Sequence, residues 1–367
     1  MAKITSKDST TEENQESREY QPLIPGLPDE VAENCLLHLP YPYQTLVRSV
    51  SSSWNRAIND PIYQLSRKSL YESQPYIFVY AFQKSTAKIQ WQAYNPRSSR
   101  WFILPSMPFS SPGFATASVP SQGKLYVLGG MGSDTKSPLR SVITYSTSTN
   151  KWEYASSMLS PRAFCAAGSI GSKIFAAGGG YEVGRQEAVQ SMERYDTETD
   201  TWSSVAGMQW GLKRYDSVVI GSKLYITEGW SWPFDVVPRG GVYDAVKNKW
   251  EVMSIGMREG WIGVSVVVND MFFVISEYGD IRVKFYVPDK DTWQCVEGEG
   301  FPYQAVKRPF SASAVDGKIF VVSCGLKVVV GSVFPVEKGL LRVEWEAVDA
   351  PKAFESFVPA TSQIVYG

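Results

Sequence analysis

The sequence predicts a mainly β protein: a six-bladed β-propeller over residues 72–367, preceded by a small three-helix domain over residues 22–71 and a disordered tail over residues 1–21. Two observations predict the propeller. Tryptophan recurs about every 50 residues, and each interval holds four short apolar runs separated by turns. A third observation predicts the separate domain, because helical spacing of apolar residues replaces strand alternation before residue 72.

The tryptophan repeat sets the register of the predicted blades. Successive intervals are 51, 50, 48, 43 and 52 residues, and in five of the six units a tyrosine stands seven residues before the tryptophan. A polar turn lies between the two residues, which predicts a β-hairpin. The sixth unit has Lys338 where tyrosine is expected, so we interpret it as a degenerate copy. The tryptophans are Trp101, Trp152, Trp202, Trp250, Trp293 and Trp345, and the tyrosines are Tyr94, Tyr145, Tyr195, Tyr243 and Tyr286.

A second pair of apolar runs precedes each predicted hairpin in the sequence, so every unit is predicted to hold four strands. Counting the runs near residues 76, 125, 174, 224, 271 and 319 gives six blades. The run at 76–80 has no partner strand before it, and residues 354–367 have no hairpin after them. We therefore expect the two ends to complete one blade. An α-solenoid is the structural alternative, which the Val, Ile, Tyr and Phe content of the runs disfavours.

Residues 23–71 have the spacing of three short helices. The first begins after Pro28, where Asp29 and Glu30 suit a helix N-terminus, and it stops before Pro40. The second is expected over residues 43–58 and the third over residues 62–70. The polar, Ser/Thr/Glu-rich segment before them cannot bury enough surface to fold.

Composition argues against several classes of function. The formal net charge is −1, which does not indicate a nucleic-acid-binding surface, and no apolar stretch is long enough to span a membrane. His38 is the only histidine, which removes most Ser-His-Asp triads and histidine metal sites. Cys165 and Cys324 stand in apolar runs, which predicts structural thiols rather than nucleophiles. We expect no catalytic residue, no metal and no cofactor.

Two sets of motifs resemble known families. Leu27-Pro28-Asp29-Glu30, the Cys35-Leu36 pair, the run from Leu46 to Ser51 and the closing Trp54-Asn55 follow the order of an F-box. The four-strand units, whose second strands end in Gly129-Gly130 and Gly178-Gly179, resemble kelch repeats. The alternative for the first segment is a helical hairpin that only caps the propeller.

This architecture resembles the plant F-box/kelch-repeat proteins. The resemblance implies a non-catalytic substrate-recognition subunit of a Skp/cullin/F-box E3 ubiquitin ligase, whose F-box binds the Skp-type adaptor and through it cullin, and whose propeller binds a protein target. It also implies phytochrome A far-red light signalling and a location in the nucleus and cytoplasm. The alternatives are a non-degradative kelch scaffold, or a receptor for a phenylpropanoid or hormone-response protein. The expected adaptor-binding residues are Leu27, Pro28, Val31, Leu36, Leu39, Leu46, Val47, Val50 and Trp54.

Substrate binding is expected at one end of the propeller. Within a blade, the loop that enters the first strand and the loop that leaves the second lie at the same end, because the two strands form a hairpin. These loops repeatedly carry arginine and aromatic residues, which dominate binding hot spots. The alternative is that these side chains form ion pairs or fill the channel. The expected substrate-binding residues are Arg162, Arg214, Tyr215, Trp230, Trp232, Phe234, Trp261 and Arg308.

Overall fold

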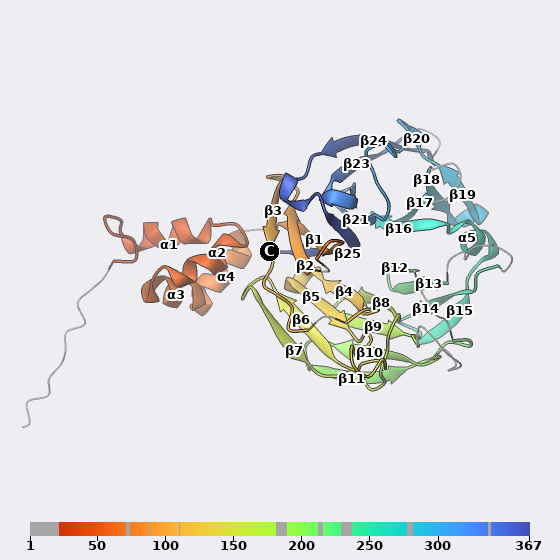
Figure 1. The fold of residues 1–367 in the computed structure, drawn as a ribbon, viewed down its shortest axis with the longest axis horizontal. Helices are drawn as coiled ribbons and strands as arrows, with labels where there is room; N and C mark the ends of the chain where they lie inside the picture. The colour runs from red at the N-terminus through yellow and green to blue at the C-terminus, as the bar shows by residue number, and fades with distance from the viewer. Residues whose placement is uncertain are drawn as a thin grey trace, which may run out of the picture. The chain divides into compact units, whose positions relative to one another are not determined.

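The computed structural model describes residues 22–70, 74–86, 88–109, 111–180, 189–211, 216–228, 237–276, 282–336 and 339–367. The chain divides into two compact units, Met1–Glu72 and Ser73–Gly367, of which the first is mainly helical and the second mainly β (Figure 1). No helix in the described ranges is long and apolar enough to cross a membrane.

The first unit contains more helical segments than the sequence suggested. It has α1 (Asp29–Leu37), α2 (Tyr43–Leu46), the 3-10 helix η1 (Val47–Ser49), α3 (Ser52–Asn59) and α4 (Pro61–Leu70). The single helix expected over residues 43–58 is therefore wrong. The chain breaks at Ser51, whose backbone is extended and whose hydroxyl accepts a hydrogen bond from the Trp54 amide at 3.1 Å. Ser51 thus caps the start of a new helix, as a serine N-cap does.

A small apolar core holds these helices together. Leu23, Ala32, Leu36, Ile58 and Tyr63 are its buried members. The indole of Trp54 donates a hydrogen bond to the carbonyl of Leu23 at 2.5 Å, and Asp29 accepts one from the amide of Leu23 at 2.9 Å. The segment before α1 is therefore bonded to both α1 and α3.

The second unit consists of six antiparallel blades, as the repeat predicted. Blade 1 runs from its inner to its outer strand as β25-β1-β2-β3, and blades 2 to 5 run β4 to β7, β8 to β11, β12 to β15 and β16 to β19. Blade 6 is β21-β22-β23-β24 with the short β20 added in parallel to β24. The inner strands face the middle of the ring in Figure 1.

The strands are short in most blades. Blade 1 comprises β1 (Pro75–Gln83), β2 (Ile89–Asn95), β3 (Arg100–Ile103) and β25 (Phe357–Tyr366). Blades 2 and 3 comprise β4 (Ala115–Val119), β5 (Lys124–Leu128), β6 (Val142–Ser146), β7 (Lys151–Ala155), β8 (Ala166–Ile170), β9 (Lys173–Ala177), β10 (Met192–Asp196) and β11 (Thr201–Val205). Blade 4 comprises β12 (Asp216–Ile220), β13 (Lys223–Thr227), β14 (Gly240–Asp244) and β15 (Lys249–Val252). Helix α5 (Ile255–Gly260) then leads to blade 5, with β16 (Gly263–Val268), β17 (Met271–Ser276), β18 (Val283–Val287) and β19 (Thr292–Cys295). Blade 6 comprises β20 (Glu297–Gly298), β21 (Ser311–Val315), β22 (Lys318–Val322), β23 (Val328–Pro335) and β24 (Leu341–Val348). Elsewhere in the propeller unit and in blade 6, short 3-10 helices occur at Pro120–Gln122, Pro288–Lys290, Cys324–Leu326 and Lys352–Phe354.

The ring closes through the last strand of the chain, which confirms the expected closure. β25 pairs with β1 along its length, with Ile77 opposite Ile364. The carbonyl of Tyr366 also accepts a hydrogen bond from the Thr147 hydroxyl of the neighbouring blade at 3.0 Å. Closure pairs the edge of β1 that would otherwise be left open, and an open strand edge is a site of aggregation.

The tyrosine and tryptophan of each hairpin pair across the two outer strands. In blades 1 to 5 the two residues are register partners, and their ring centroids lie 5.1 to 5.4 Å apart. Each tryptophan in blades 2 to 5 donates its indole N–H to a carbonyl in the segment that follows the preceding blade, which for Trp293 is α5. The repeated pair therefore packs within a blade and joins it to its neighbour.

In blade 6 the tryptophan has a different cross-strand partner from the one that the sequence repeat predicts. Trp345 pairs with Gly331, not with a residue seven positions before it, because β23 and β24 are eight residues long and lengthen the hairpin. Lys338 lies outside the described residues. A side chain at position 331 would lie 2.6 Å from the Trp345 ring, so the missing tyrosine is replaced by direct packing of the indole on the glycine backbone.

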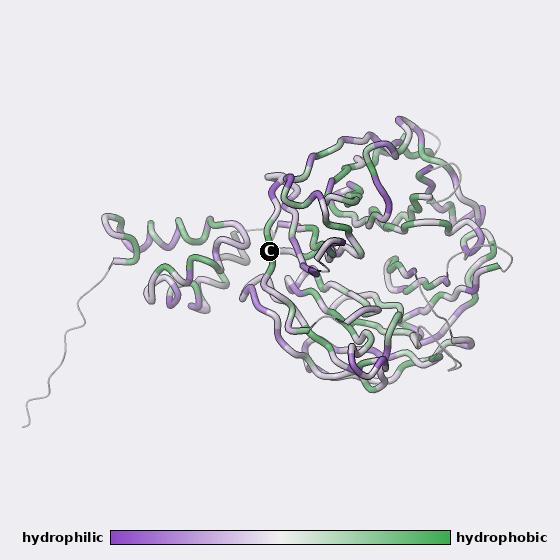
Figure 2. The backbone as a smooth tube through the Cα atoms, in the orientation of Figure 1, coloured by the Kyte–Doolittle hydropathy of each residue, from purple (hydrophilic) through white to green (hydrophobic). Residues whose placement is uncertain are grey.

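The hydropathy of the chain follows this layered arrangement. Figure 2 shows apolar residues along the blade strands and more hydrophilic residues at the outer rim. The outermost strand of blade 2 has no buried residue, whereas four of the five residues of β5 in the same blade are buried. The apolar cores therefore lie between adjacent blades and toward the inner strands, which leaves the strand ends and loops for binding.

Candidate adaptor surface and target-binding cavity

The helical unit leaves several large apolar side chains in solvent. Among the residues expected to bind an adaptor, Leu27, Val31, Leu46 and Val50 are 38%, 47%, 52% and 62% exposed, and Pro28 is exposed too. Ile62 and Leu65 of α4 are also exposed, and they were not among the residues predicted from the sequence. Their signal was their spacing of three residues on a predicted helix, which places both on one face. We call Leu27, Val31, Leu46, Val50, Ile62 and Leu65 the exposed apolar set.

The other four expected adaptor residues belong to the core. Leu36 is 1% exposed, and Leu39, Val47 and Trp54 are partly buried against the same cluster. Helical spacing predicts which apolar residues share one face of a helix. It does not predict which of these faces packs into the core. Leu36 and Trp54 therefore support the helices that present the exposed apolar set.

Arg162 in the propeller is enclosed. Its side chain is fully buried and pairs with Glu193 at 2.7 Å. The guanidinium also donates to the carbonyls of Gly178 and Ser191 at 2.7 and 2.8 Å. Glu193 in turn accepts backbone N–H groups of the 159–160 turn. Arg162 therefore joins the loop before blade 3 to the strands of that blade, and its geometry does not support the expected direct contact with a target.

Trp261 is also buried, at 1% exposure. Its ring packs edge-on against Phe272 with centroids 4.5 Å apart, and its indole donates to the carboxylate of Asp216 at 3.0 Å. Arg308 is exposed on the loop before β21, and its backbone carbonyl accepts a hydrogen bond from the Cys324 thiol at 3.1 Å. The remaining expected substrate-binding residues, Arg214, Tyr215, Trp230, Trp232 and Phe234, lie outside the described residues.

A cavity of about 520 Å³ lies where the inner strands begin. All six blades contribute to it, because its wall is built from the starts of β4, β8, β12, β16 and β21 and from the middle of β25. This is the end of the propeller at which the sequence predicted binding. The lining residues are Phe114, Ala115, Thr116, Cys165, Ala166, Ala167, Asp216, Ser217, Gly263, Val264, Ser265, Phe310, Ser311, Ala312, Ala360, Thr361, Ser362 and Gln363.

Asp216 is the charged residue of this lining. Its Oδ2 accepts hydrogen bonds from the Trp261 indole at 3.0 Å and the Ser265 hydroxyl at 2.6 Å, while Oδ1 accepts the Ser217 amide at 2.9 Å. Desolvation nevertheless raises the pKa of Asp216 above its usual range. Asp216 was not among the residues predicted from the sequence, although the repeat contained a signal for it. The equivalent first residues of the other inner strands are Ala115, Ala166, Gly263 and Ser311, which are small and uncharged.

Cys165 also lines the cavity and is a buried member of a neighbouring apolar cluster. Desolvation raises the pKa of Cys165 to about 11, so the thiol is protonated at neutral pH. Because the thiolate is the nucleophilic form, this cysteine has the properties of a structural residue, as its apolar context predicted.

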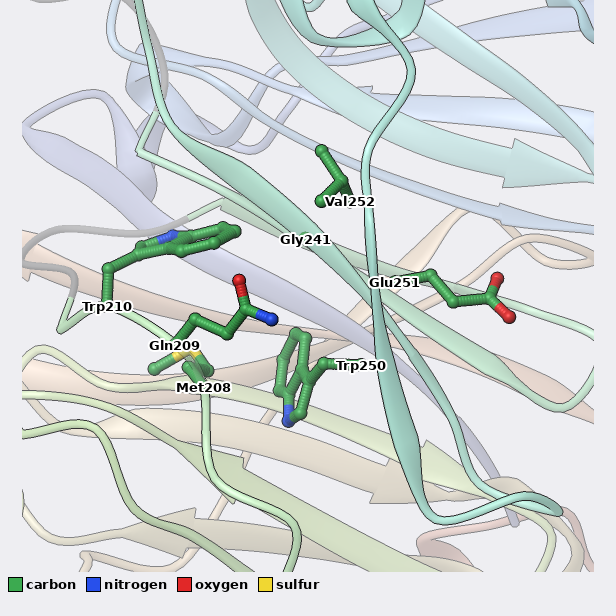
Figure 3. Close-up of a pocket in the computed structure, with 7 residues that line it drawn as sticks. All are labelled: Met208, Gln209, Trp210, Gly241, Trp250, Glu251 and Val252. Carbon is green, nitrogen blue, oxygen red and sulfur yellow. The ribbon is translucent and has the colours of Figure 1, made fainter.

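Two other hollows differ from the central cavity. One of about 330 Å³ lies between blades 4 and 5, with Tyr225, Met257 and Phe272 among its walls. The other, shown in Figure 3, lies between Trp210 and Trp250 beside Gly241 and holds only about 10 Å³. That volume is at the lower limit for a single water molecule, so Figure 3 shows a packing gap between blades and not a ligand site.

Comparison with known proteins agrees with both units. Residues 24–64 match the F-box domain, and residues 83–330 match the FKB95 kelch-repeats domain. The chain is 46% identical to F-box protein AFR of Arabidopsis thaliana, over 99% of this chain and 97% of that protein. It is 36% identical to an F-box/kelch-repeat protein of the same plant, over 94% of this chain and 87% of the relative. It is 30% identical to F-box/kelch-repeat protein SKIP30, over 75% of this chain and 76% of that protein.

These matches identify the class of the protein. An F-box unit with an exposed apolar set and a six-bladed propeller with a central cavity define a substrate adaptor of the F-box type. The chain belongs to the F-box/kelch-repeat family.

Proposed function

We propose that this protein is the substrate-recognition subunit of a Skp/cullin/F-box E3 ubiquitin ligase. The observation that carries the proposal is the exposed apolar set of the F-box unit. Six large apolar side chains exposed over about 40 residues are costly in water, and a partner that covers them gains roughly 25 cal/mol for each Å² of apolar surface buried. A Skp-type adaptor, which links an F-box to cullin, is the partner that fits this unit.

The propeller completes the proposed receptor. Its central cavity and the loops around it supply concave, hydrogen-bonding surface of the size used for ligand recognition. We propose that this end of the propeller captures a protein target and that the chain itself performs no chemistry on it.

The biological setting is a further part of the proposal. The resemblance to plant F-box/kelch-repeat proteins of light signalling supports a role in the far-red response downstream of phytochrome A, and with it a location in the nucleus and cytoplasm. Light-dependent degradation of a bound protein, lost when this chain is absent, is the expected cellular result.

The adaptor assignment is tested with the full chain and purified Skp-type adaptor. In a Leu46→Ala, Val50→Ala double variant we expect at least about ten-fold weaker adaptor binding, because truncation of interface anchors commonly costs about 2 kcal/mol or more. The matched control is Ile103→Ala with Val252→Ala, which removes two similarly exposed side chains from the outer strands of the propeller. Binding should be unchanged in the control.

The proposal fails if the F-box variant binds the adaptor as tightly as the parent chain. It also fails if the purified protein carries a target but neither adaptor nor cullin, because that result would identify a non-degradative scaffold. Co-purification of both ligase subunits with the parent chain, and their loss with the double variant, is the supporting outcome.

A further inference from the structure

The central cavity is not filled by the side chains that line it. Its volume of about 520 Å³ lies within the range of ligand sites in proteins. Small residues begin most of the inner strands, among them Ala115, Ala166, Gly263 and Ser311, so the backbone and short side chains form the wall. The volume of the cavity is therefore sufficient for a long side chain.

The chemistry of the wall is polar with one negative charge. Hydroxyl and amide groups come from Thr116, Ser217, Ser265, Thr361 and Gln363. Asp216 is the one residue with a formal charge among the described residues that line the cavity. A ligand that complements this surface carries a positive charge and several hydrogen-bond donors.

Asp216 has capacity for such a ligand. A carboxylate can accept about four hydrogen bonds, and Asp216 uses two on Oδ2 and one on Oδ1. The three donors are an indole, a hydroxyl and a backbone amide, and all are neutral. The charge thus has no cationic partner among the described residues that line the cavity, although desolvation makes a lone charge expensive.

A second polar group in the wall is independent of Asp216. Ser311 begins β21, is 7% exposed, and has a hydroxyl with no hydrogen-bond partner among the described residues. Buried polar groups in native proteins are nearly always paired with protein, water or ligand, so an unpaired hydroxyl lining a cavity is available to a ligand atom. In contrast, Thr116 and Gln363 in the same wall already bond to each other at 3.2 Å.

We propose that the central cavity receives the side chain of a lysine or arginine residue of the captured protein, with its cationic group paired to Asp216 and a donor reaching toward the Ser311 hydroxyl. The inference rests on the proposed function as a target receptor. An ammonium or guanidinium group supplies only donors, which matches both the carboxylate and the free lone pairs of the hydroxyl.

A purely structural role for Asp216 is the competing explanation. Its bonds to Trp261 and Ser265 join blade 4 to the segment that begins blade 5, so the residue holds two blades together as well. A structural role does not account for the cavity or for the unpaired Ser311 hydroxyl. It also predicts no response of this site to an added cation, which makes the two explanations separable.

The test uses the full chain bound to its adaptor and records the tryptophan indole signals by NMR. The Trp261 indole N–H donates to Asp216 and therefore reports entry of a cation directly, with its signal assigned from a Trp261→Phe variant. The probes are Nα-acetyl-lysine N-methylamide and Nα-acetyl-arginine N-methylamide. The uncharged control is Nα-acetyl-norleucine N-methylamide, and n-butylammonium represents a free small amine.

We expect a saturable shift of the Trp261 signal with the lysine or arginine amide and none with the norleucine amide. Asp216→Asn should weaken that binding about ten-fold or more, because it removes the charge while keeping an acceptor. Asp270→Asn is the matched control, since Asp270 lies just beyond the opposite end of β16, and it should leave the affinity unchanged. Ser311→Ala should weaken binding without lowering the melting temperature, because it deletes an unpaired buried hydroxyl.

Three results would overturn the inference: no shift with either cationic amide, an equal shift with the norleucine amide, or unchanged affinity in both Asp216→Asn and Ser311→Ala. Binding of n-butylammonium alone would also overturn it, because the cavity would then hold a free amine and not a protein side chain. Adaptor binding is measured on the same samples. Its loss would contradict the proposed ligase function, whereas its retention with a silent cavity would contradict only this inference.

Discussion

The F-box unit and the propeller treat their large apolar side chains in opposite ways. In the F-box unit, Leu46 and Val50 are more than half exposed although they stand beside a small core. In the propeller, the tyrosines of the repeated hairpins are buried. Tyr94, Tyr145 and Tyr243 are at most 1% exposed. The first unit therefore concentrates exposed apolar side chains in a short segment that another molecule can cover, whereas the repeated aromatic pairs of the second unit are covered by the propeller itself.

This difference separates residues that bind from residues that fold. A substitution in the propeller repeat is expected to change stability before it changes binding. A substitution in the exposed apolar set is expected to change binding with little effect on stability, since surface substitutions usually stay within about 0.5 kcal/mol. Four measurements test this separation.

Removal of residues 357–367 should have the largest effect. It deletes β25, so β1 loses its partner and the inner position of blade 1 is empty. We expect loss of the cooperative melting transition and aggregation, because the edge of β1 that β25 covers becomes unpaired. A deletion protein that remains monomeric with an unchanged melting temperature would show that the ring does not depend on this strand.

Replacement of Arg162 by methionine should come next. Glu193 would then keep a buried negative charge without its cation, and breaking one side of a buried ion pair typically costs about 3–5 kcal/mol. Urea unfolding measures this loss. The double variant Arg162→Met, Glu193→Gln should regain part of the stability, because no net charge is left buried. Equal destabilisation by both variants would contradict the electrostatic explanation.

Within the F-box unit, two neighbouring positions should respond differently. Leu36→Ala is expected to cost about 2–5 kcal/mol of local stability because it empties part of the core, whereas Val50→Ala should be nearly neutral. Hydrogen exchange of the amides in α3 measures the local stability of this unit. Similar hydrogen-exchange rates in the two variants would contradict the distinction between core and exposed residues.

The smallest effect is expected from Asp291→Asn in blade 5. Hydrogen bonds from Ser254 and Tyr286 hold the pKa of Asp291 at about 2. A depressed carboxyl pKa contributes stability above the usual carboxyl range, and this contribution is lost as the pH falls toward 2. Parent and variant should therefore differ at pH 7 and converge in acid, as followed by the urea midpoint. Blade 4 already has Asn248 at this position, bonded to Tyr243 at 2.7 Å, so the variant is expected to fold. A difference that does not depend on pH would contradict the assignment.

The sequence predicted the propeller well because its signal repeats. The Tyr–Trp spacing reports a cross-strand pair in five blades, and the closing strand followed from the unpaired run at 76–80. The rule failed in blade 6, where longer strands move Trp345 opposite Gly331.

The sites were harder to predict because burial is a property of the folded chain. Arg162 and Trp261 have the composition of hot-spot residues, yet their neighbours enclose them. Leu36 and Val50 are both apolar on helical segments, and only packing against Leu23, Ile58 and Tyr63 decides between them. Asp216 was detectable as the charged exception among small residues in one repeat position, a signal that appears once the inner strands are aligned.

The pairing of Pro75 with Tyr366 also has a consequence for synthesis of the protein. The ribosome makes β1 directly after the F-box unit, but its partner β25 emerges only after the other five blades. The nascent chain must therefore carry an open edge, and with it an incomplete cavity, throughout translation of the ring. During this interval the F-box unit already has all of its own residues, while the central cavity lacks the wall that β25 supplies. Under the proposed function, adaptor binding can thus precede completion of the cavity.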